Sequence, residues 1–308
     1  MGPGRHLPFS AVCFNGSVTR ARTRFLVLST ATAAGMLAGA AMAGRGLLQR
    51  QAAAVRRVIG KPLGEEAIDA DRVWKKKYGD PIDLLLLGDS IAAGLGAERP
   101  KETLGGRLAR ALAKETGRAV RLRTAARVGS ESSMLGAQLA ALPPTYRPDV
   151  AVVVVGGNDV THRVPVADAA KHLEVAVGAL RDRGAGVVVG TCPDLGALRP
   201  VPQPLRALGS RASRQLALAQ EAAAVAAGAH AVSLAHVVGP FFITNPDEMF
   251  SLDRFHPSAL GYQRTAKAML PSVLAALGLR EDLPFGHRAP IEGIGEPTLD
   301  TEPGPAPQ

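Results

Sequence analysis

IDLLLLGDS, residues 82–90, is a short apolar run that ends in a glycine and two polar residues. The run from Ile82 to Leu87 has the length of a strand, and its apolar character, interrupted only by Asp83, is typical of a strand buried on both faces. Such strands belong to parallel sheets covered by helices, whose ligands gather at the carboxyl ends of the strands. Ser90 therefore lies at a position where a ligand-binding or catalytic residue is expected.

Working outward, apolar runs alternate with segments of helical periodicity along the chain. The other expected strands are Val120–Ala125, Val150–Val155, Gly186–Val189 and Ala229–Leu234. Helices are expected at Thr103–Glu115, Ser132–Ala141, Val166–Arg183, Pro204–Ala227 and Ser258–Leu277. This alternation predicts an α/β fold, a three-layer α/β/α sandwich around a five-stranded parallel, flavodoxin-like sheet.

The domain organisation follows from shifts in composition. We expect a basic N-terminal segment at 1–24, a signal peptide or membrane anchor at 25–44 and a charged connector at 45–79. The catalytic domain is expected at 80–279, and a disordered, proline-rich tail at 280–308. With 308 residues and 46% hydrophobic content, the chain can bury a substantial core.

The basic charge is concentrated at the N-terminal end. Residues 1–80 carry 13 Lys and Arg against 5 Asp and Glu, so nearly all of the net charge of +9 lies there. A nucleic-acid enzyme would carry basic residues on its folded domain, with aromatic side chains that stack on bases, whereas aromatic residues make up only 4% of this chain. We therefore expect no nucleic-acid partner.

The uncharged run 25–44 follows three arginines and ends near the small residues Ala41 and Ala43. This pattern is typical of an export signal, and the run is also long enough for a membrane anchor. An alanine-rich helix packed on the domain is a third interpretation. Both of the first two predict an exported protein, secreted or anchored at the cell surface.

No pattern predicts a cofactor or a metal. Cys13 and Cys192 form no disulfide framework, and no His/Cys cluster has metal-ligand spacing. The chain lacks the Gly-Lys-Ser/Thr of a phosphate loop, and the glycines at 94 and 96 lack the third glycine of a dinucleotide loop. Cys192 is expected to be a small buried residue.

Ser90 has two interpretations. At the end of a strand and near a helix N-terminus it is well placed as a nucleophile, because free backbone N–H groups there stabilise a developing oxyanion. Alternatively it caps the helix. The chain has no Gly-x-Ser-x-Gly elbow at this position, which disfavours the α/β-hydrolase fold.

Two other strand ends carry candidate oxyanion donors. Asn158 follows Gly156 and Gly157 after an apolar run, and its amide is a neutral donor; alone, this segment also suits a simple turn. Gly129 follows an earlier run and could contribute a backbone N–H, or serve only the geometry of the connection.

Asp253 and His256 stand just before the last expected helix. A carboxylate three residues before a histidine can accept from its Nδ1–H and leave Nε2 facing a serine. The alternative is that this histidine simply starts the helix. His162 lies close after Asn158, where it could contact substrate.

In chain order these elements resemble the blocks of the SGNH hydrolases, also called GDSL esterases/lipases, over roughly residues 80 to 278. The resemblance implies a nucleophile at Ser90, an Asp253 and His256 pair, and an oxyanion hole from Ser90, Gly129 and Asn158. Ala92 departs from the family pattern, where a second serine is common. We expect a serine hydrolase that cleaves carboxylic esters.

Two other functions remain open on the same fold. The first is a deacetylase of an O-acetylated glycan or cell-wall polymer, so the expected substrate is a small ester or an acylated glycan. The second is a non-catalytic, surface-anchored binding domain, which the fold alone does not exclude. Membrane association, if present, is expected through 25–44.

Overall fold

The computed structural model describes residues 36, 38–55, 57 and 66–291. The chain divides into two units, Met1–Gln51 and Ala52–Gln308. In the first, residues 38–51 are helical and largely exposed. The predicted basic segment 1–24 and most of the predicted signal or anchor 25–44 lie outside the described residues. Among the residues described, no helix is both long and apolar enough to cross a membrane.

The second unit is built on a seven-stranded sheet in the order β1-β3-β2-β4-β5-β6-β7. Neighbours from β3 to β6 run parallel, which confirms the predicted parallel core of five strands. The strands are β1 (Val73–Trp74), β2 (Pro81–Gly88), β3 (Ala119–Thr124), β4 (Val150–Val154), β5 (Gly186–Gly190), β6 (His230–Val232) and β7 (His287–Arg288).

The two edge strands correct the sequence-based prediction. β1 pairs antiparallel with β3, and β7 pairs antiparallel with β6. The predicted connector 45–79 therefore contributes β1, and the predicted tail 280–308 contributes β7. Both are only two residues long, too short to show a hydrophobic period, and they occupy edges that would otherwise leave backbone groups unpaired. Residues 292–308 lie outside the described part of the chain.

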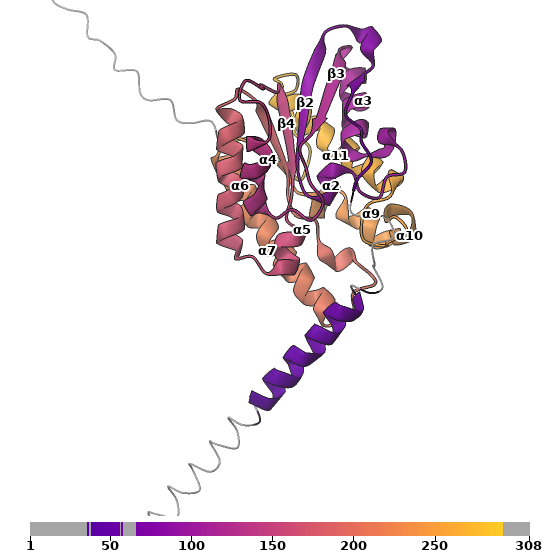
Figure 1. The fold of residues 1–308 in the computed structure, drawn as a ribbon, viewed down its shortest axis with the longest axis vertical. Helices are drawn as coiled ribbons and strands as arrows, with labels where there is room; N and C mark the ends of the chain where they lie inside the picture. The colour runs from indigo at the N-terminus through magenta and orange to yellow at the C-terminus, as the bar shows by residue number, and fades with distance from the viewer. Residues whose placement is uncertain (1–35, 37, 56, 58–65, 292–308) are drawn as a thin grey trace, which may run out of the picture. The chain divides into compact units, whose positions relative to one another are not determined.

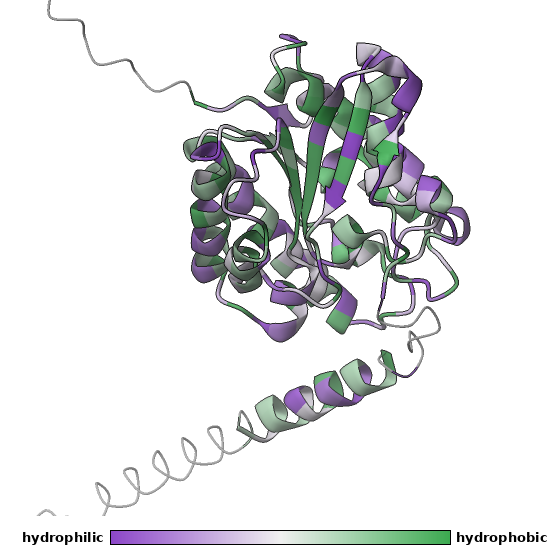
Figure 2. Ribbon diagram, turned by 45° about the horizontal axis from the view of Figure 1, so that its top comes forward, coloured by the Kyte–Doolittle hydropathy of each residue, from purple (hydrophilic) through white to green (hydrophobic). Residues whose placement is uncertain are grey.

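Side-chain alternation within each strand supplies two hydrophobic layers. Leu84 and Leu86 of β2 pack on one face, and Leu85 and Leu87 pack on the other. Because helices cover both faces, both sets are buried, and the strand reads as one apolar run. Figure 2 shows the central strands as hydrophobic along most of their length.

Helices cover the two faces as Figure 1 shows. On one side lie α3 (Leu104–Thr116) and α11 (Ala259–Ala276); on the other lie α4 (Leu135–Ala140), α6 (Val166–Arg181) and α7 (Leu205–Ala226). Single-turn and short helices follow the strands: α2 (Ser90–Ala93), α5 (Gly157–His162), α8 (Leu234–Val237), α9 (Gly239–Thr244) and α10 (Pro246–Met249). Four 3₁₀ helices complete the described elements: Lys76–Tyr78, Pro100–Glu102, Ser132–Met134 and Leu195–Ala197.

One strand boundary differs from the prediction with a consequence for the site. β6 ends at Val232, and Leu234 begins α8, so the predicted strand Ala229–Leu234 is shorter than expected. The apolar residues from Leu234 to Phe242 form α8 and α9 instead. They pack beside the carboxyl ends of the strands, where they line a cavity next to Ser90.

Candidate active site

Ser90 occupies the first position of α2, directly after β2. The helix cap is Asp89, whose Oδ1 accepts a hydrogen bond from the Ile91 N–H at 3.0 Å. The interpretation of Ser90 as the capping residue is therefore wrong. Because its neighbour satisfies the helix, the Ser90 hydroxyl is free for another partner.

The turn between β2 and α2 requires glycine. Gly88 has φ +127°, and a Cβ there would lie 1.8 Å from the carbonyl oxygen of Val154 on the adjacent strand. Buried Gln138 of α4 holds the same residue, since its amide accepts from the Gly88 N–H at 2.9 Å and donates to the Gly88 carbonyl at 2.8 Å. This close fit sets the direction in which Ser90 leaves the sheet.

His256 approaches Ser90 from the loop before α11. Its Nε2 lies 2.9 Å from the Ser90 Oγ, and its Nδ1 lies 2.6 Å from the Asp253 Oδ2. A carboxylate only accepts, so Nδ1 carries the proton and Nε2 is free to accept from the serine hydroxyl. The structure thus brings together three side chains that are predicted from the sequence to form a relay.

Asp253 is held as a carboxylate by its own loop. Its Oδ1 accepts from the Ser251 hydroxyl and from the N–H groups of Phe255 and His256, all within 2.9 Å. Burial alone would raise the pKa of Asp253, but the bonds to the His256 side chain and to these backbone groups outweigh it and lower the pKa to about 2. Asp253 is therefore a carboxylate at neutral pH.

Asp89 has the opposite electrostatic character. It is buried, and this burial raises its pKa to about 6 despite the hydrogen bond from Ile91 and the nearby His256. A carboxyl group next to the serine therefore titrates near neutral pH. No sequence argument assigned a role to this residue.

Asn158 lies on α5 and lines the same cavity as Ser90. Its Nδ2 donates one hydrogen bond to the Ser130 carbonyl at 2.9 Å, which leaves the second amide hydrogen available. Gly129 is exposed and precedes this carbonyl by one residue, but it does not line the cavity. Two of the predicted oxyanion donors, Ser90 and Asn158, therefore line the cavity. Gly129 lies outside this lining, next to the residue that Asn158 contacts.

Two further contacts join the loop after β3 to α5. Buried Asp159 accepts from both the N–H and the hydroxyl of Ser132 at 3.1 Å. His162 Nδ1 lies 2.6 Å from a carboxylate oxygen of Glu131. The partner of His162 is thus a protein carboxylate, and the histidine helps to hold together the two segments that carry Asn158 and Gly129.

The glycine that precedes α5 has a structural role. Gly156 has φ +140°, and a Cβ there would lie 2.9 Å from the Cβ of Cys192. Cys192 is buried and free, and burial raises its pKa well above the usual value, so it is a packing residue. Glycine at this position therefore allows the close approach of the segment that carries Cys192.

A small apolar cavity of about 80 Å³ opens beside the relay. Ser90, Asn158 and His256 line one part of it. The remainder is largely hydrophobic and includes Leu195, Leu198, Leu234, Val238, Phe242, Phe250 and Phe255. Such a lining suits an apolar group bound next to the serine.

Several contributors to this site have no signal in the sequence. Gln138 lies within a helix and carries no motif, and the leucines of the cavity read as ordinary core residues. For these leucines, the only signal in the sequence is their position after β5 and β6, at the ligand-binding edge of a parallel sheet. Within the part of the chain that the structure describes, no group of three or more His, Cys, Asp or Glu residues could hold a metal ion.

Comparison with known proteins adds evolutionary evidence to this geometry. Residues 86–264 match the GDSL-like Lipase/Acylhydrolase family, a span that covers more than half of the chain. The chain belongs to this family. It is also 39% identical over 297 residues to the GDSL-like esterase Rv1075c of Mycobacterium tuberculosis, with 92% of each chain covered. This GDSL-like protein is therefore a carboxylic ester hydrolase.

Solved structures agree on the fold. The lipase/acylhydrolase from Enterococcus faecalis superposes with a TM-score of 0.52 at 20% identity, covering 65% of this chain and 100% of the other. The esterase EstA from Pseudoalteromonas gives a TM-score of 0.50 at 19% identity, covering 64% and 98%. The predicted SGNH hydrolase fold is confirmed.

Proposed function

We propose that this GDSL-like protein cleaves carboxylic esters through an acyl-enzyme on Ser90, with His256 as base and Asp253 as its orienting partner. The observation that carries the proposal is the continuous relay of 2.6 Å and 2.9 Å contacts from the Asp253 carboxylate through the imidazole to the Ser90 hydroxyl. A helix cap or a packing residue would need no such alignment.

The reaction proceeds in two halves. His256 Nε2 takes the hydroxyl proton while Ser90 Oγ attacks the ester carbonyl, and the imidazolium then gives that proton to the departing alcohol. Water next attacks the acyl-enzyme with the same base, and the carboxylic acid leaves as Ser90 regains its proton. The ionised Asp253 stabilises the imidazolium in both halves.

Three donors are proposed to stabilise the oxyanion: the N–H groups of Ser90 and Gly129, and the second amide hydrogen of Asn158. Support comes from the hydrogen bond that the Asn158 amide donates to the Ser130 carbonyl. This bond orients the amide and ties it to the loop that also carries Gly129. The contacts of Asp159 and His162 with that loop hold the two segments at a constant separation. Fixed donors of this kind stabilise charge without reorganisation.

The acyl group is proposed to be short and apolar. The cavity next to Ser90 is about 80 Å³ and lined largely by apolar residues, among them three leucines and three phenylalanines, which favours a modest acyl chain over a long one. An acetyl group fits this description as well, so a deacetylase acting on an O-acetylated glycan or cell-wall polymer is the second candidate. A non-catalytic binding role would not require the hydrogen-bonded alignment of Asp253, His256 and Ser90.

The place of action is also a proposal. The uncharged run 25–44 with its preceding arginines supports export, either by a cleaved signal or with a retained anchor. Cell fractionation with an antibody to residues 66–291 tests this: recovery outside the cytoplasm is expected, and recovery only within the cytoplasm contradicts it.

A panel of p-nitrophenyl esters of increasing acyl length tests the enzymatic proposal, with Ser90→Ala as the blank. We expect the highest kcat/KM on short chains and loss of turnover in the variant. Ser251→Ala is the comparison, because this serine lies on the His256 loop and its hydroxyl donates to Asp253. It should lower turnover only in part, since two backbone N–H groups still bind the same carboxylate oxygen. Full activity of Ser90→Ala would overturn the assignment.

A further inference from the structure

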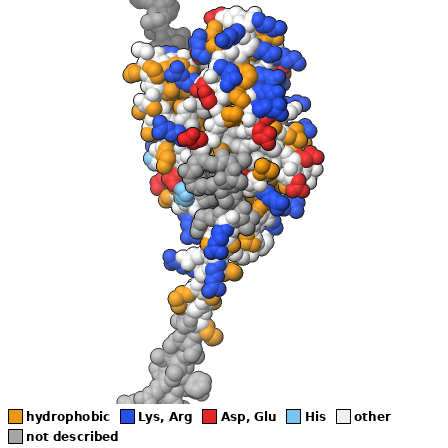
Figure 3. Space-filling model, turned by 45° about the vertical axis from the view of Figure 1, so that its right-hand side comes forward, with side chains coloured by type: hydrophobic (Ala, Val, Ile, Leu, Met, Phe, Trp, Pro, Cys, Tyr) orange, Lys and Arg blue, Asp and Glu red, His pale blue; other side chains and the backbone are white. Residues whose placement is uncertain are grey.

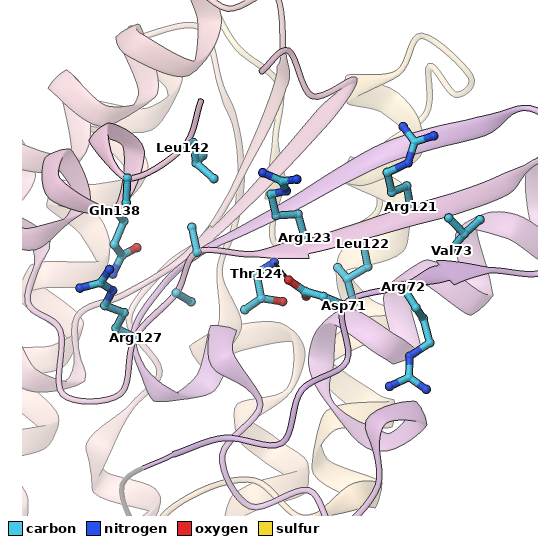
Figure 4. A pocket seen from close by; sticks show the side chains of 13 residues that line it. Asp71, Arg72, Val73, Arg121, Leu122, Arg123, Thr124, Arg127, Gln138 and Leu142 are labelled. Carbon is cyan, nitrogen blue, oxygen red and sulfur yellow. Dashed lines mark hydrogen bonds between the residues drawn. The ribbon is translucent and has the colours of Figure 1, made fainter. Parts of the chain in front are cut away.

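A second depression lies along β3, away from the cavity beside Ser90. It has a volume of about 550 Å³ and is lined by residues of the segment around β1, of β3 and of α4. Four arginines line it, Arg72, Arg121, Arg123 and Arg127, against the single carboxyl group of Asp71. Figure 4 shows Arg121 and Arg123 on β3, Arg127 beyond the end of the strand, and Arg72 projecting to the other side, and we call this depression the arginine groove.

The groove exists because one face of β3 is left open. Val120 and Leu122 point into the core beneath α3, so the residues between them point to the opposite face. Arg121 and Arg123 occupy that face, where α4 is only six residues long. Figure 4 shows both guanidinium groups projecting to the same side of the strand.

The positive charge of the groove is only partly neutralised. Arg121 pairs with Asp83 at 2.9 Å, whereas Arg123 stacks on the ring of Tyr146 within electrostatic reach of Asp71, and Arg72 stacks on the ring of Trp74. Among the described residues, no carboxylate pairs with Arg127. Asp71 is the one carboxyl group among the lining residues, and its Oδ2 accepts a hydrogen bond from the Thr124 N–H at 2.9 Å.

The groove is joined to the catalytic machinery at its Arg127 end. The Arg127 N–H donates to the carbonyl of Gly88, two residues before the proposed nucleophile. Gln138, which also lines the groove, contacts Gly88 and the hydroxyl of Ser130. Arg127 itself is exposed two residues before Gly129. The positive charge therefore leads up to the loop that is proposed to hold the oxyanion.

We propose that the arginine groove binds the alcohol portion of the substrate, a polymer that bears carboxylate or phosphate groups along with the acyl ester. This inference rests on the proposed function, because the acyl group must enter the cavity beside Ser90. Guanidinium groups bind carboxylates and phosphates through paired hydrogen bonds, and an extended row of them fits a chain with repeated negative charges. Figure 3 shows one face of the molecule, on which Lys and Arg side chains are interspersed with Asp and Glu.

The test compares acetate release from three acetylated polymers: polygalacturonate, which carries carboxylates, poly(glycerol phosphate), which carries phosphates, and neutral xylan. The measured quantity is the ratio of kcat/KM on each anionic polymer to that on xylan, which cancels any general loss of activity. The variant is Arg123→Gln/Arg127→Gln. The matched control is Arg211→Gln, an exposed arginine on α7, which packs against β5 and β6.

We expect the wild type to prefer at least one anionic polymer, and the double variant to lower that ratio about fivefold, as two exposed ion pairs would. The preference should weaken in 0.5 M NaCl, while Arg211→Gln retains it. The polymer with the higher ratio identifies carboxylate or phosphate as the recognised group.

Equal ratios in the wild type and the double variant would overturn the proposal, as would an equal fall in Arg211→Gln. Loss of cosedimentation with phosphatidylglycerol vesicles at an unchanged ratio would instead make the groove a membrane contact, which also overturns it. If p-nitrophenyl acetate is cleaved in a Ser90-dependent manner but no polymer is preferred, the groove inference fails and the proposed function stands.

Discussion

His256 Nε2 lies 2.9 Å from the Ser90 Oγ although 166 positions separate the two residues in the chain. The parallel sheet makes this meeting possible, because β2 delivers Ser90 to the same edge at which the loop before α11 ends. Asp253, three residues before the histidine, completes the alignment at 2.6 Å. The consequences of this arrangement can be measured one residue at a time.

Asp253→Asn should lower kcat by about 10³- to 10⁴-fold with little change in KM, because the imidazole loses the carboxylate that sets its tautomer. Steady-state kinetics on p-nitrophenyl acetate measure this. Asp182→Asn, at the exposed end of α6, is the matched control and should retain wild-type rates. A loss below tenfold in Asp253→Asn would show that the carboxylate does not orient the base.

Asn158→Ala should lower kcat by about 10²- to 10³-fold, the usual effect of removing one oxyanion donor. The same replacement at Asn245, before α10, should have no comparable effect. Circular dichroism must show that both variants are folded, since Asn158 also binds the Ser130 carbonyl. Wild-type kcat in a folded Asn158→Ala protein would remove the side chain from the oxyanion hole.

Asp89 should make the folded protein less stable as pH rises. Its pKa is about 6 when folded and 3.8 when unfolded, so its favourable contribution is complete below pH 4 and is lost as pH rises through 6. The difference corresponds to about 3 kcal/mol in the free energy of unfolding. Urea unfolding of wild type and of Asp89→Asn at pH 4.5 and pH 7.5 measures about 2 kcal/mol of this difference.

Asparagine keeps an oxygen acceptor for the Ile91 N–H but does not ionise, so Asp89→Asn should lack this component of the pH dependence. An identical change in unfolding free energy between the two pH values in both proteins would contradict the raised pKa. Groups that do not interact with Asp89 contribute equally in the two proteins, so the comparison isolates this carboxyl group together with its couplings to His256 and Asp159.

Leu198→Ala should move the preferred acyl chain toward greater length, because Leu198 lines the cavity beside Ser90 and its truncation enlarges the space. The gain for one added methylene is expected to be about tenfold or less in relative kcat/KM. Leu208→Ala, on the exposed side of α7, is the control. An unchanged length profile in Leu198→Ala would place the acyl group elsewhere.

The sequence predicted the parallel core well because Leu84 to Leu87 and Val150 to Val155 are continuous apolar runs, and because apolar residues alternate with Arg121 and Arg123 in β3. It missed β1 and β7, whose two residues each show no period and whose pairing depends on contacts distant in sequence. It also extended β6 to Leu234, because an apolar residue at a helix start has the same composition as one in a buried strand.

The site was predictable to a similar extent. Ser90, Asn158 and Asp253 follow strands or precede a helix in short motifs, so the residues could be named before their meeting was seen. Gln138 could not, because its role depends on where α4 packs. Likewise, the partner of His162 is Glu131, a contact between residues 31 positions apart in the chain.

Ser90 can be tested as the nucleophile by mapping the residue that a fluorophosphonate probe labels, since the probe reacts with an activated serine and leaves a covalent mass that peptide mass spectrometry locates. We expect one stoichiometric adduct on Ser90, absent from Ser90→Ala and formed much more slowly in Asp253→Asn. An adduct on another serine, or none on folded wild-type protein, would contradict it.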